Sequence, residues 1–158
     1  MRTVRNIFLL FAAALSLGAM ELVSGQTSDD AIRVTVTMNP DGSKTVYETN
    51  GASHRSVATT TDANGKVREK IIYRLDPEGR YESGEVFTGR GVFRFRSLYH
   101  YDSGGRLTEE TQTGKNGTVR HKIVYRFDAE GHPSGYAVYD GEGNLLGQTT
   151  SKAARPSP

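Results

Sequence analysis

The chain has no cysteine and no tryptophan among its 158 residues. Without cysteine it has no disulfides and no lipoprotein anchor. It also has no Gly-x-Ser-x-Gly nucleophile elbow, no phosphate-binding loop and no dinucleotide fingerprint. These absences indicate that the protein is not an enzyme and uses no cofactor.

The chain also has no large excess of positive or negative charge. Lys and Arg number 20 and Asp and Glu number 18, which gives a formal net charge of +2. Removing Arg2, Arg5 and Glu21 with the N-terminal segment leaves +1. A chain so close to neutral has no strong general attraction for nucleic acid or acidic membranes, so nucleic acid is not an expected partner.

The one long apolar run stands at the N-terminus. Arg2 and Arg5 precede an apolar stretch, Ile7 to Gly18, which is short for a bilayer span, and Val23-Ser24-Gly25 offers small residues for cleavage. The sequence therefore predicts a signal peptide over residues 1–25, cut near Gly25. An uncleaved membrane anchor is the alternative.

The remaining boundaries follow from composition. We expect a flexible N-terminus over 26–30, a single β-repeat domain over 31–150 and a disordered tail over 151–158. After signal removal no transmembrane helix is expected. An exported chain without disulfides is typical of a bacterial envelope or medium, so we expect a secreted or periplasmic protein.

Glycine-containing turns divide the domain. Asp-x-x-Gly between strand-like runs is typical of a type I turn with a glycine bulge, because the Asp side chain accepts backbone hydrogen bonds and the Gly takes a positive φ. Five tetrads have this form: Asp62-Gly65, Asp76-Gly79, Asp102-Gly105, Asp128-Gly131 and Asp140-Gly143. Asn39-Gly42 also fits, and Thr88-Gly91, Gly114-Gly117 and Glu48-Gly51 keep only the final glycine.

The turns are regularly spaced. Their starts at 62, 76, 88, 102, 114, 128 and 140 are alternately 14 and 12 residues apart, so 26 residues hold one pair of strands. This predicts an all-β fold: an antiparallel up-and-down meander of about 8–10 short strands, built from a 26-residue hairpin repeat and curled or barrel-like. No segment after the signal has a helical period, so no helix of note is expected.

Alternation along the three long strands predicts two unlike faces. One face collects Val67, Ile71, Tyr73, Leu75, Phe93, Phe95, Tyr99, Tyr101, Val119, Ile123, Tyr125 and Phe127. The other collects Arg68, Lys70, Arg74, Arg94, Arg96, His100, Arg120, Lys122 and Arg126. The expected pairs are Leu75 with Tyr81, Tyr101 with Leu107, Phe127 with Pro133 and Tyr139 with Leu145, with Glu82 near Arg74 and Glu110 near Lys122.

An apolar face this wide must be covered. The options are curling or closure of the meander around its aromatic residues, or packing against a partner or a second copy, and we favour curling. The first strand does not fit this scheme, because the pairing sends Ile32, Val34 and Val36 to the charged side. Either the Glu48-Gly51 turn is wrong or this strand packs elsewhere.

Residues of roughly 67–146 resemble the YD repeats of the RHS family. The resemblance rests on Tyr99, Tyr101, Asp102, Gly105, Arg106, Leu107, Gly117, Tyr125, Asp128, Gly131, Tyr139, Asp140, Gly143 and Asn144. Phe127 and Leu75 stand where the second Tyr is usual, and His132 where Arg or Asn is usual. The resemblance implies a spiralling β-sheet that acts as a surface scaffold, in some members with carbohydrate binding.

The basic face supplies the candidate binding residues. Arg94, Arg96, His100, Arg120, Lys122 and Arg126 form rows suited to an anionic glycan, and a solvated charged face is the alternative. The four histidines have no metal-ligand spacing, and the turn aspartates are too far apart to converge on one ion, so no metal site is expected.

Taken together, the sequence predicts an exported, non-enzymatic β-repeat module for binding or scaffolding at the bacterial cell envelope, with a glycan or an envelope protein as partner. The alternative is an outer-membrane or small ligand-holding β-barrel. An enzyme would need His100 or His132 to meet a carboxylate in a pocket.

Overall fold

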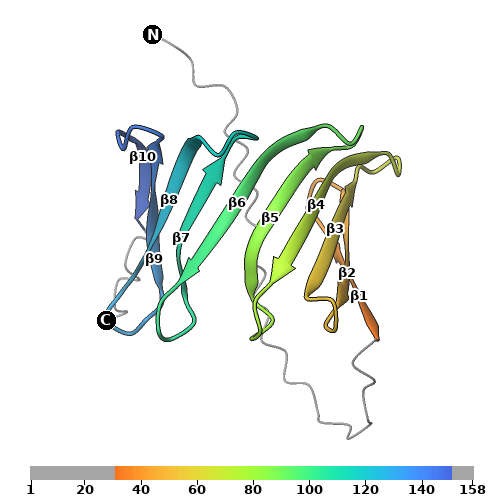
Figure 1. Cartoon of the computed structure of the whole chain (residues 1–158), viewed down its shortest axis with the longest axis horizontal. Helices are drawn as coiled ribbons and strands as arrows, with labels where there is room; N and C mark the ends of the chain where they lie inside the picture. Colours follow the sequence, from red (N-terminus) through yellow and green to blue (C-terminus); the bar gives the residue numbers. More distant parts are fainter. Residues whose placement is uncertain (1–30, 151–158) are drawn as a thin grey trace, which may run out of the picture.

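The computed structural model describes residues 31–150, which form one sheet of ten antiparallel strands (Figure 1). The strands are β1 (Ile32–Met38), β2 (Lys44–Asn50), β3 (Arg55–Thr61), β4 (Val67–Leu75), β5 (Tyr81–Thr88), β6 (Phe93–Tyr101), β7 (Leu107–Thr113), β8 (Val119–Phe127), β9 (Pro133–Asp140) and β10 (Leu145–Thr150). Their order in the sheet is their order in the chain, and residues 31–150 contain no helix. The predicted all-β antiparallel meander is confirmed. The signal peptide, the flexible N-terminus and the C-terminal tail were predicted for residues outside the described range.

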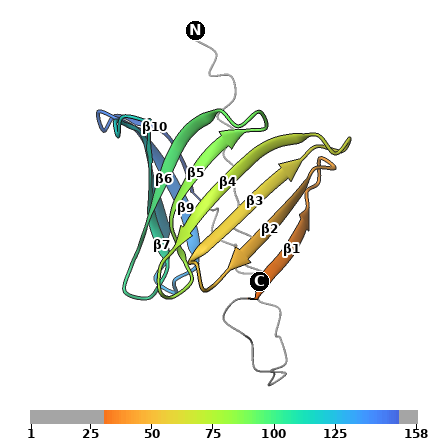
Figure 2. The ribbon, with the colours of Figure 1, turned by 45° about the vertical axis from the view of Figure 1, so that its right-hand side comes forward.

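The sheet is curled but open. β1 and β10 are the two end strands, and each pairs with one neighbour only. Figures 1 and 2 show the sheet bent into a trough with these strands at its rims. Closure into a barrel, which the outer-membrane and ligand-holding alternatives require, is therefore wrong for this part of the chain. The two end strands, β1 and β10, contain no aromatic residue that could fill the interior of a closed barrel.

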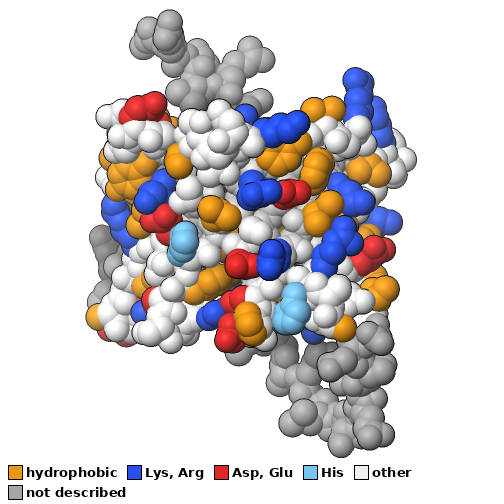
Figure 3. All heavy atoms as spheres, in the orientation of Figure 1, with side chains coloured by type: hydrophobic (Ala, Val, Ile, Leu, Met, Phe, Trp, Pro, Cys, Tyr) orange, Lys and Arg blue, Asp and Glu red, His pale blue; other side chains and the backbone are white. Residues whose placement is uncertain are grey.

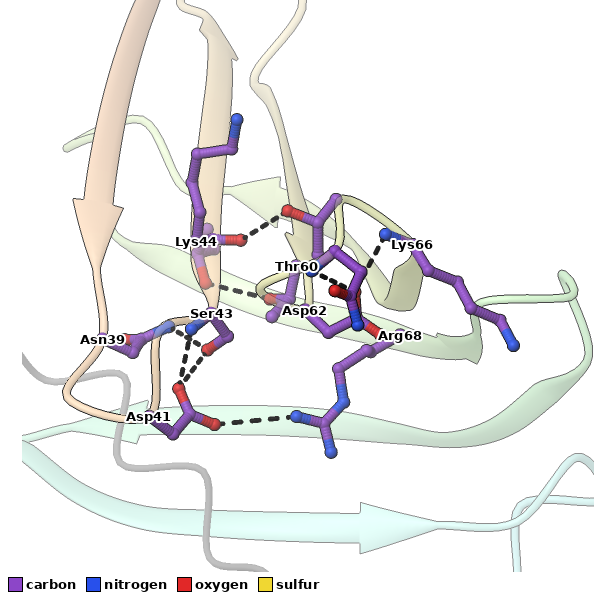
Figure 4. A network of polar contacts seen from close by, with 11 residues as sticks. Asn39, Asp41, Ser43, Lys44, Thr60, Asp62, Lys66 and Arg68 are labelled. Atoms are coloured by element: carbon purple, nitrogen blue, oxygen red, sulfur yellow. Dashed lines mark hydrogen bonds and ion pairs between the residues drawn. The ribbon is translucent and has the colours of Figure 1, made fainter.

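The hairpin turns are held by their own backbone and side chains. In the β4–β5 turn, Gly79 N–H donates to Asp76 O at 2.9 Å, and Asp76 Oδ1 accepts the Arg80 N–H at 2.8 Å. Gly79 has φ of 79°, a conformation that other residues resist. In the β1–β2 turn, Asp41 Oδ1 accepts both the N–H and the hydroxyl of Ser43 (Figure 4).

The β2–β3 connection differs from the expected turn at Glu48-Gly51. Residues 48 to 50 belong to β2, and Asn50 pairs with Arg55 across the hairpin. The turn lies at residues 51–54, where His54 N–H donates to Gly51 O at 3.0 Å. The glycine of the tetrad therefore begins the turn instead of ending it.

The concave face, called the tyrosine face below, holds the core. Tyr73 is 4% exposed and stacks on Tyr81 with ring centroids 4.0 Å apart, and Tyr99 lies 6.4 Å from Tyr73. Small residues make room for the rings. Gly84 lies directly beneath Tyr73, and Ser56 and Ser97 are each 1% exposed. The predicted partners Leu75–Tyr81, Tyr101–Leu107, Phe127–Pro133 and Tyr139–Leu145 are confirmed.

Bulges move some side chains to the opposite face from the one expected. The β5–β6 register shifts between Val86 and Phe87, which leaves Arg94 as the extra residue. Phe93 then contacts Phe87 at 5.8 Å between ring centroids, and Arg94 reaches Glu69. Placing Phe93 on the apolar face and Arg94 on the charged face was wrong, because one inserted residue reverses the alternation beyond it.

A bulge also changes the partner of one of the two expected ion pairs. Arg74 pairs with Glu82 at 3.0 Å, as expected. Lys122 pairs with Glu109 at 3.0 Å, so its expected pairing with Glu110 is wrong. A register shift at the start of the β7–β8 pairing advances the partners by one residue and sends Glu110 to the tyrosine face.

Gly84→Ala should destabilise the sheet, because a β-carbon at this position would lie 3.0 Å from two ring atoms of Tyr73. We expect the free energy of unfolding to fall by about 1–3 kcal/mol. Urea titration followed by tyrosine fluorescence measures this. Gly51→Ala is the matched control, since a β-carbon there has nothing within 4 Å. Equal effects of the two substitutions would contradict the packing described.

Asp102→Asn should flatten the dependence of stability on acid pH. Hydrogen bonds from the Arg106 backbone N–H and then from its side chain lower the pKa of Asp102. A carboxyl with a lowered folded-state pKa stabilises the fold above about pH 4 and loses this effect as pH falls through the folded-state pKa. The melting temperature should therefore fall less in the variant than in wild type as pH is lowered from about 5 to 2. Parallel falls in the two proteins would contradict the stabilising role of the Asp102 carboxylate.

Candidate functional site

The convex face is hollowed over β5, β6 and the β7–β8 turn. The depression has a volume of about 350 Å³ and is lined by Glu85, Phe87, Phe93, Arg96, Thr113, Gly114, Lys115 and Gly117. The Phe87 and Phe93 rings meet edge to face at 77°. Phe93 reaches this face only because of the bulge beside it, so simple alternation could not have found the aromatic pair.

Two cationic side chains line the depression, one that is ion-paired to a carboxylate within residues 31–150 and one that is not. Arg96 forms an ion pair with Glu85 across the β5–β6 pairing. Lys115 is exposed in the β7–β8 turn and has no acidic partner among the residues the structure describes. Two aromatic rings beside these groups make a surface that is both apolar and weakly positive.

The six candidate binding residues are not gathered in one site. Arg96 lines the depression, and Lys122 pairs with Glu109 on the same convex face. His100 stands opposite Glu109, and Arg126 is exposed opposite Gly135. Figure 3 shows basic and acidic side chains interleaved over this face. Such compensation weakens the attraction of the convex face as a whole for anions.

Arg94 and Arg120 have different surroundings from the other four. Arg94 Nη1 lies 3.1 Å from Glu69 Oε2, whose side chain is 10% exposed. Arg120 Nη1 donates to the Arg94 carbonyl oxygen at 2.9 Å. Arg68 likewise reaches back across β3 to Asp41 (Figure 4). These arginines, at positions 68, 94 and 120, stand at bulges and tie each long strand to an earlier part of the sheet.

A polar cluster occupies the tyrosine face around Glu110. Glu110 Oε1 accepts hydrogen bonds from Ser97 Oγ at 2.7 Å and Gln112 Nε2 at 2.9 Å. Tyr125 donates its hydroxyl to Glu110 Oε2 at 3.5 Å. Burial raises the pKa of Tyr99 and Tyr125 well above the usual range, so both stay neutral donors. The carboxylate is held by neutral partners, which favours a structural role over proton transfer.

The β8–β9 turn brings Asp128, Glu130 and His132 together, with ligand atoms within 4.8 Å of one another. The sequence analysis missed this group, which the spacing Asp-x-Glu-x-His could have indicated. All three residues are exposed, and Asp128 Oδ1 already accepts the His132 N–H at 2.7 Å. His132 occupies the place held by Arg80 and Arg106 in two other turns, each ion-paired to its turn aspartate.

Comparison with protein-family models finds no match for the chain, and comparison with curated proteins finds none either. Residues 31–150 contain no helix that is long and apolar enough to cross a membrane.

Arg94→Met should test the structural role of this arginine. Burial raises the pKa of Glu69, and the Arg94 guanidinium opposes that rise. Removing Arg94 leaves a buried carboxylate without its cation, so the free energy of unfolding should fall by about 1–3 kcal/mol at pH 7. The loss should shrink as pH falls towards 4, because Glu69 is then protonated in the folded state.

The control is Arg74→Met, since Arg74 and Glu82 form an exposed pair whose loss should change stability by less than about 1 kcal/mol. Denaturant titrations of both variants at several pH values make the comparison. A loss at Arg94 that does not change with pH would rule out its pairing with Glu69 as the cause.

Proposed function

We propose that the protein is an exported, non-enzymatic β-repeat module that binds an acidic carbohydrate at the bacterial cell envelope. We also propose that the chain is built from a 26-residue hairpin repeat with Asp-x-x-Gly turns and is related to YD-repeat proteins. Residues 1–25, with Arg2 and Arg5 before an apolar stretch, support export. We infer the class of ligand from the residues that line the depression around Phe87 and Phe93.

The lining of the depression suits a sugar ring that carries a carboxylate. The two phenylalanine rings offer apolar surface for the C–H face of a sugar. Lys115 offers a cation at the rim, and Arg96 adds a second cation that Glu85 partly neutralises. Ligand sites commonly combine aromatic surface with a few polar groups in this way.

The position of the depression on one face of an open sheet favours a polymer over a small metabolite. Its lining residues lie on the convex face, where an extended chain can pass over them and continue along the sheet. A pair of exposed opposite charges contributes only about 0.2–1 kcal/mol, so one sugar unit would be held weakly. Contacts with successive units would raise the affinity without a deep pocket.

Lys115→Ala should weaken binding of a tetragalacturonate probe by about two- to fivefold, which corresponds to roughly 0.4–1 kcal/mol for the loss of one exposed charge pair. Phe93→Ala should weaken it similarly by removing apolar contact. Titration calorimetry, or NMR shifts of the Phe87 and Phe93 ring signals, gives the dissociation constant. Neutral maltotetraose should bind much more weakly than the charged probe.

Arg74→Ala is the matched control, because Arg74 is an exposed cation on the same face that does not line the depression. It should leave binding unchanged. Absence of tetragalacturonate binding to the wild-type protein, or equal losses in Lys115→Ala and Arg74→Ala, would remove the proposal of a carbohydrate site.

A further inference from the structure

The β1 rim of the sheet is both unpaired and apolar. β1 has β2 as its only neighbour among the ten strands, and Figure 2 shows it at the edge of the trough. Ile32, Val34, Val36 and Met38 all project to the convex face and are 54–68% exposed. A regular edge strand with exposed apolar side chains is a template for another strand.

The backbone groups of the same residues are directed away from β2. Asn39 N–H donates to Ser43 O, which sets the hydrogen-bonded positions of the β1–β2 ladder at every second residue. Counting back along the register, Thr37, Thr35 and Arg33 bond to β2. The N–H and C=O groups of Val34, Val36 and their even-numbered neighbours therefore point to the open edge.

β1 lacks two of the features that usually protect an edge strand, a bulge and a proline. Its register with β2 runs from Ile32 to Met38 without a shift, and it contains no proline. Its one charged residue, Arg33, projects to the concave side. The opposite rim is different, because a bulge interrupts the β9–β10 pairing between Leu145 and Gly147. The two rims are therefore not equivalent, and β1 is the one suited to pairing.

We propose that β1 pairs antiparallel with β1 of a second copy of this chain, about a two-fold axis through Thr35. In this register Val34 faces Val36 of the second copy and Ile32 faces its Met38. Every even-numbered residue of the strand then meets an apolar residue and exchanges hydrogen bonds through its outward backbone groups. A two-residue slip would leave Ile32 or Met38 without an apolar partner, so the register is defined.

A second copy fits this edge better than an unrelated strand, because the strand is complementary to itself. Arg33 would face Thr37 of the second copy, so no like charges meet across the seam. The chain has a formal net charge of only +2, so two copies do not repel each other strongly. The two-fold axis stands normal to the sheet, so both concave faces stay on the same side.

Thr35→Cys tests the register directly. The chain has no other cysteine. Residue 35 would face its own copy at a non-hydrogen-bonded pair, where Cα atoms are about 4.5 Å apart, within the range that a disulfide spans. Mild oxidation of the full chain should give a disulfide-linked dimer as the main product. Arg33→Cys, on the same strand and face, should give little, because residue 33 faces residue 37 of the copy.

Sedimentation tests the association itself. Wild type should sediment as a dimer, and Val34→Lys with Val36→Lys should sediment as a monomer with an unchanged far-ultraviolet spectrum. Leu146→Lys, a matched charge at the other rim, should remain a dimer. A wild-type monomer, equal crosslinking of Thr35→Cys and Arg33→Cys, or longer assemblies that Leu146→Lys disrupts would each overturn the proposal; the last would indicate head-to-tail pairing of β1 with β10.

Discussion

The stacking of tyrosine rings over small residues on the concave face is the contact on which the sheet depends. The described chain is a single layer, so no second sheet or helix covers its apolar residues. Tyr73 and Tyr81 bury each other only because the strands curl towards them and because Gly84 leaves room beneath the ring. The curvature of the sheet, the packing of the tyrosine rings and the positions of the small side chains therefore depend on one another.

Bulges carry much of this curvature and also distribute the chemistry. An extra residue near the turn increases the local twist of a strand and reverses its alternation. At Arg94 the reversal turns a cation towards Glu69 on the concave side and leaves Phe93 on the convex side. The aromatic depression and the ion pair are therefore two consequences of one inserted residue.

The two rims of the sheet differ in how readily they can pair with a strand of another molecule. An open meander has two edges, and here one is regular and apolar while the other is bulged. The convex face has interleaved charges suited to solvent, and it carries the depression that is proposed as a ligand site. The proposed ligand site on the convex face and the proposed self-association at the β1 edge use different residues, so one does not require the other.

Much of the fold could be predicted from the amino-acid sequence. Period-two alternation and evenly placed glycines are local signals, so the meander, its strand pairs and partners such as Leu75–Tyr81 followed from them. Neither the side of Arg94 and Glu110 nor the open rims could be read in this way. A bulge depends on how two strands meet, and closure depends on whether distant strands reach each other. Such relations between segments far apart in the chain leave no local pattern, and only the assembled sheet determines them.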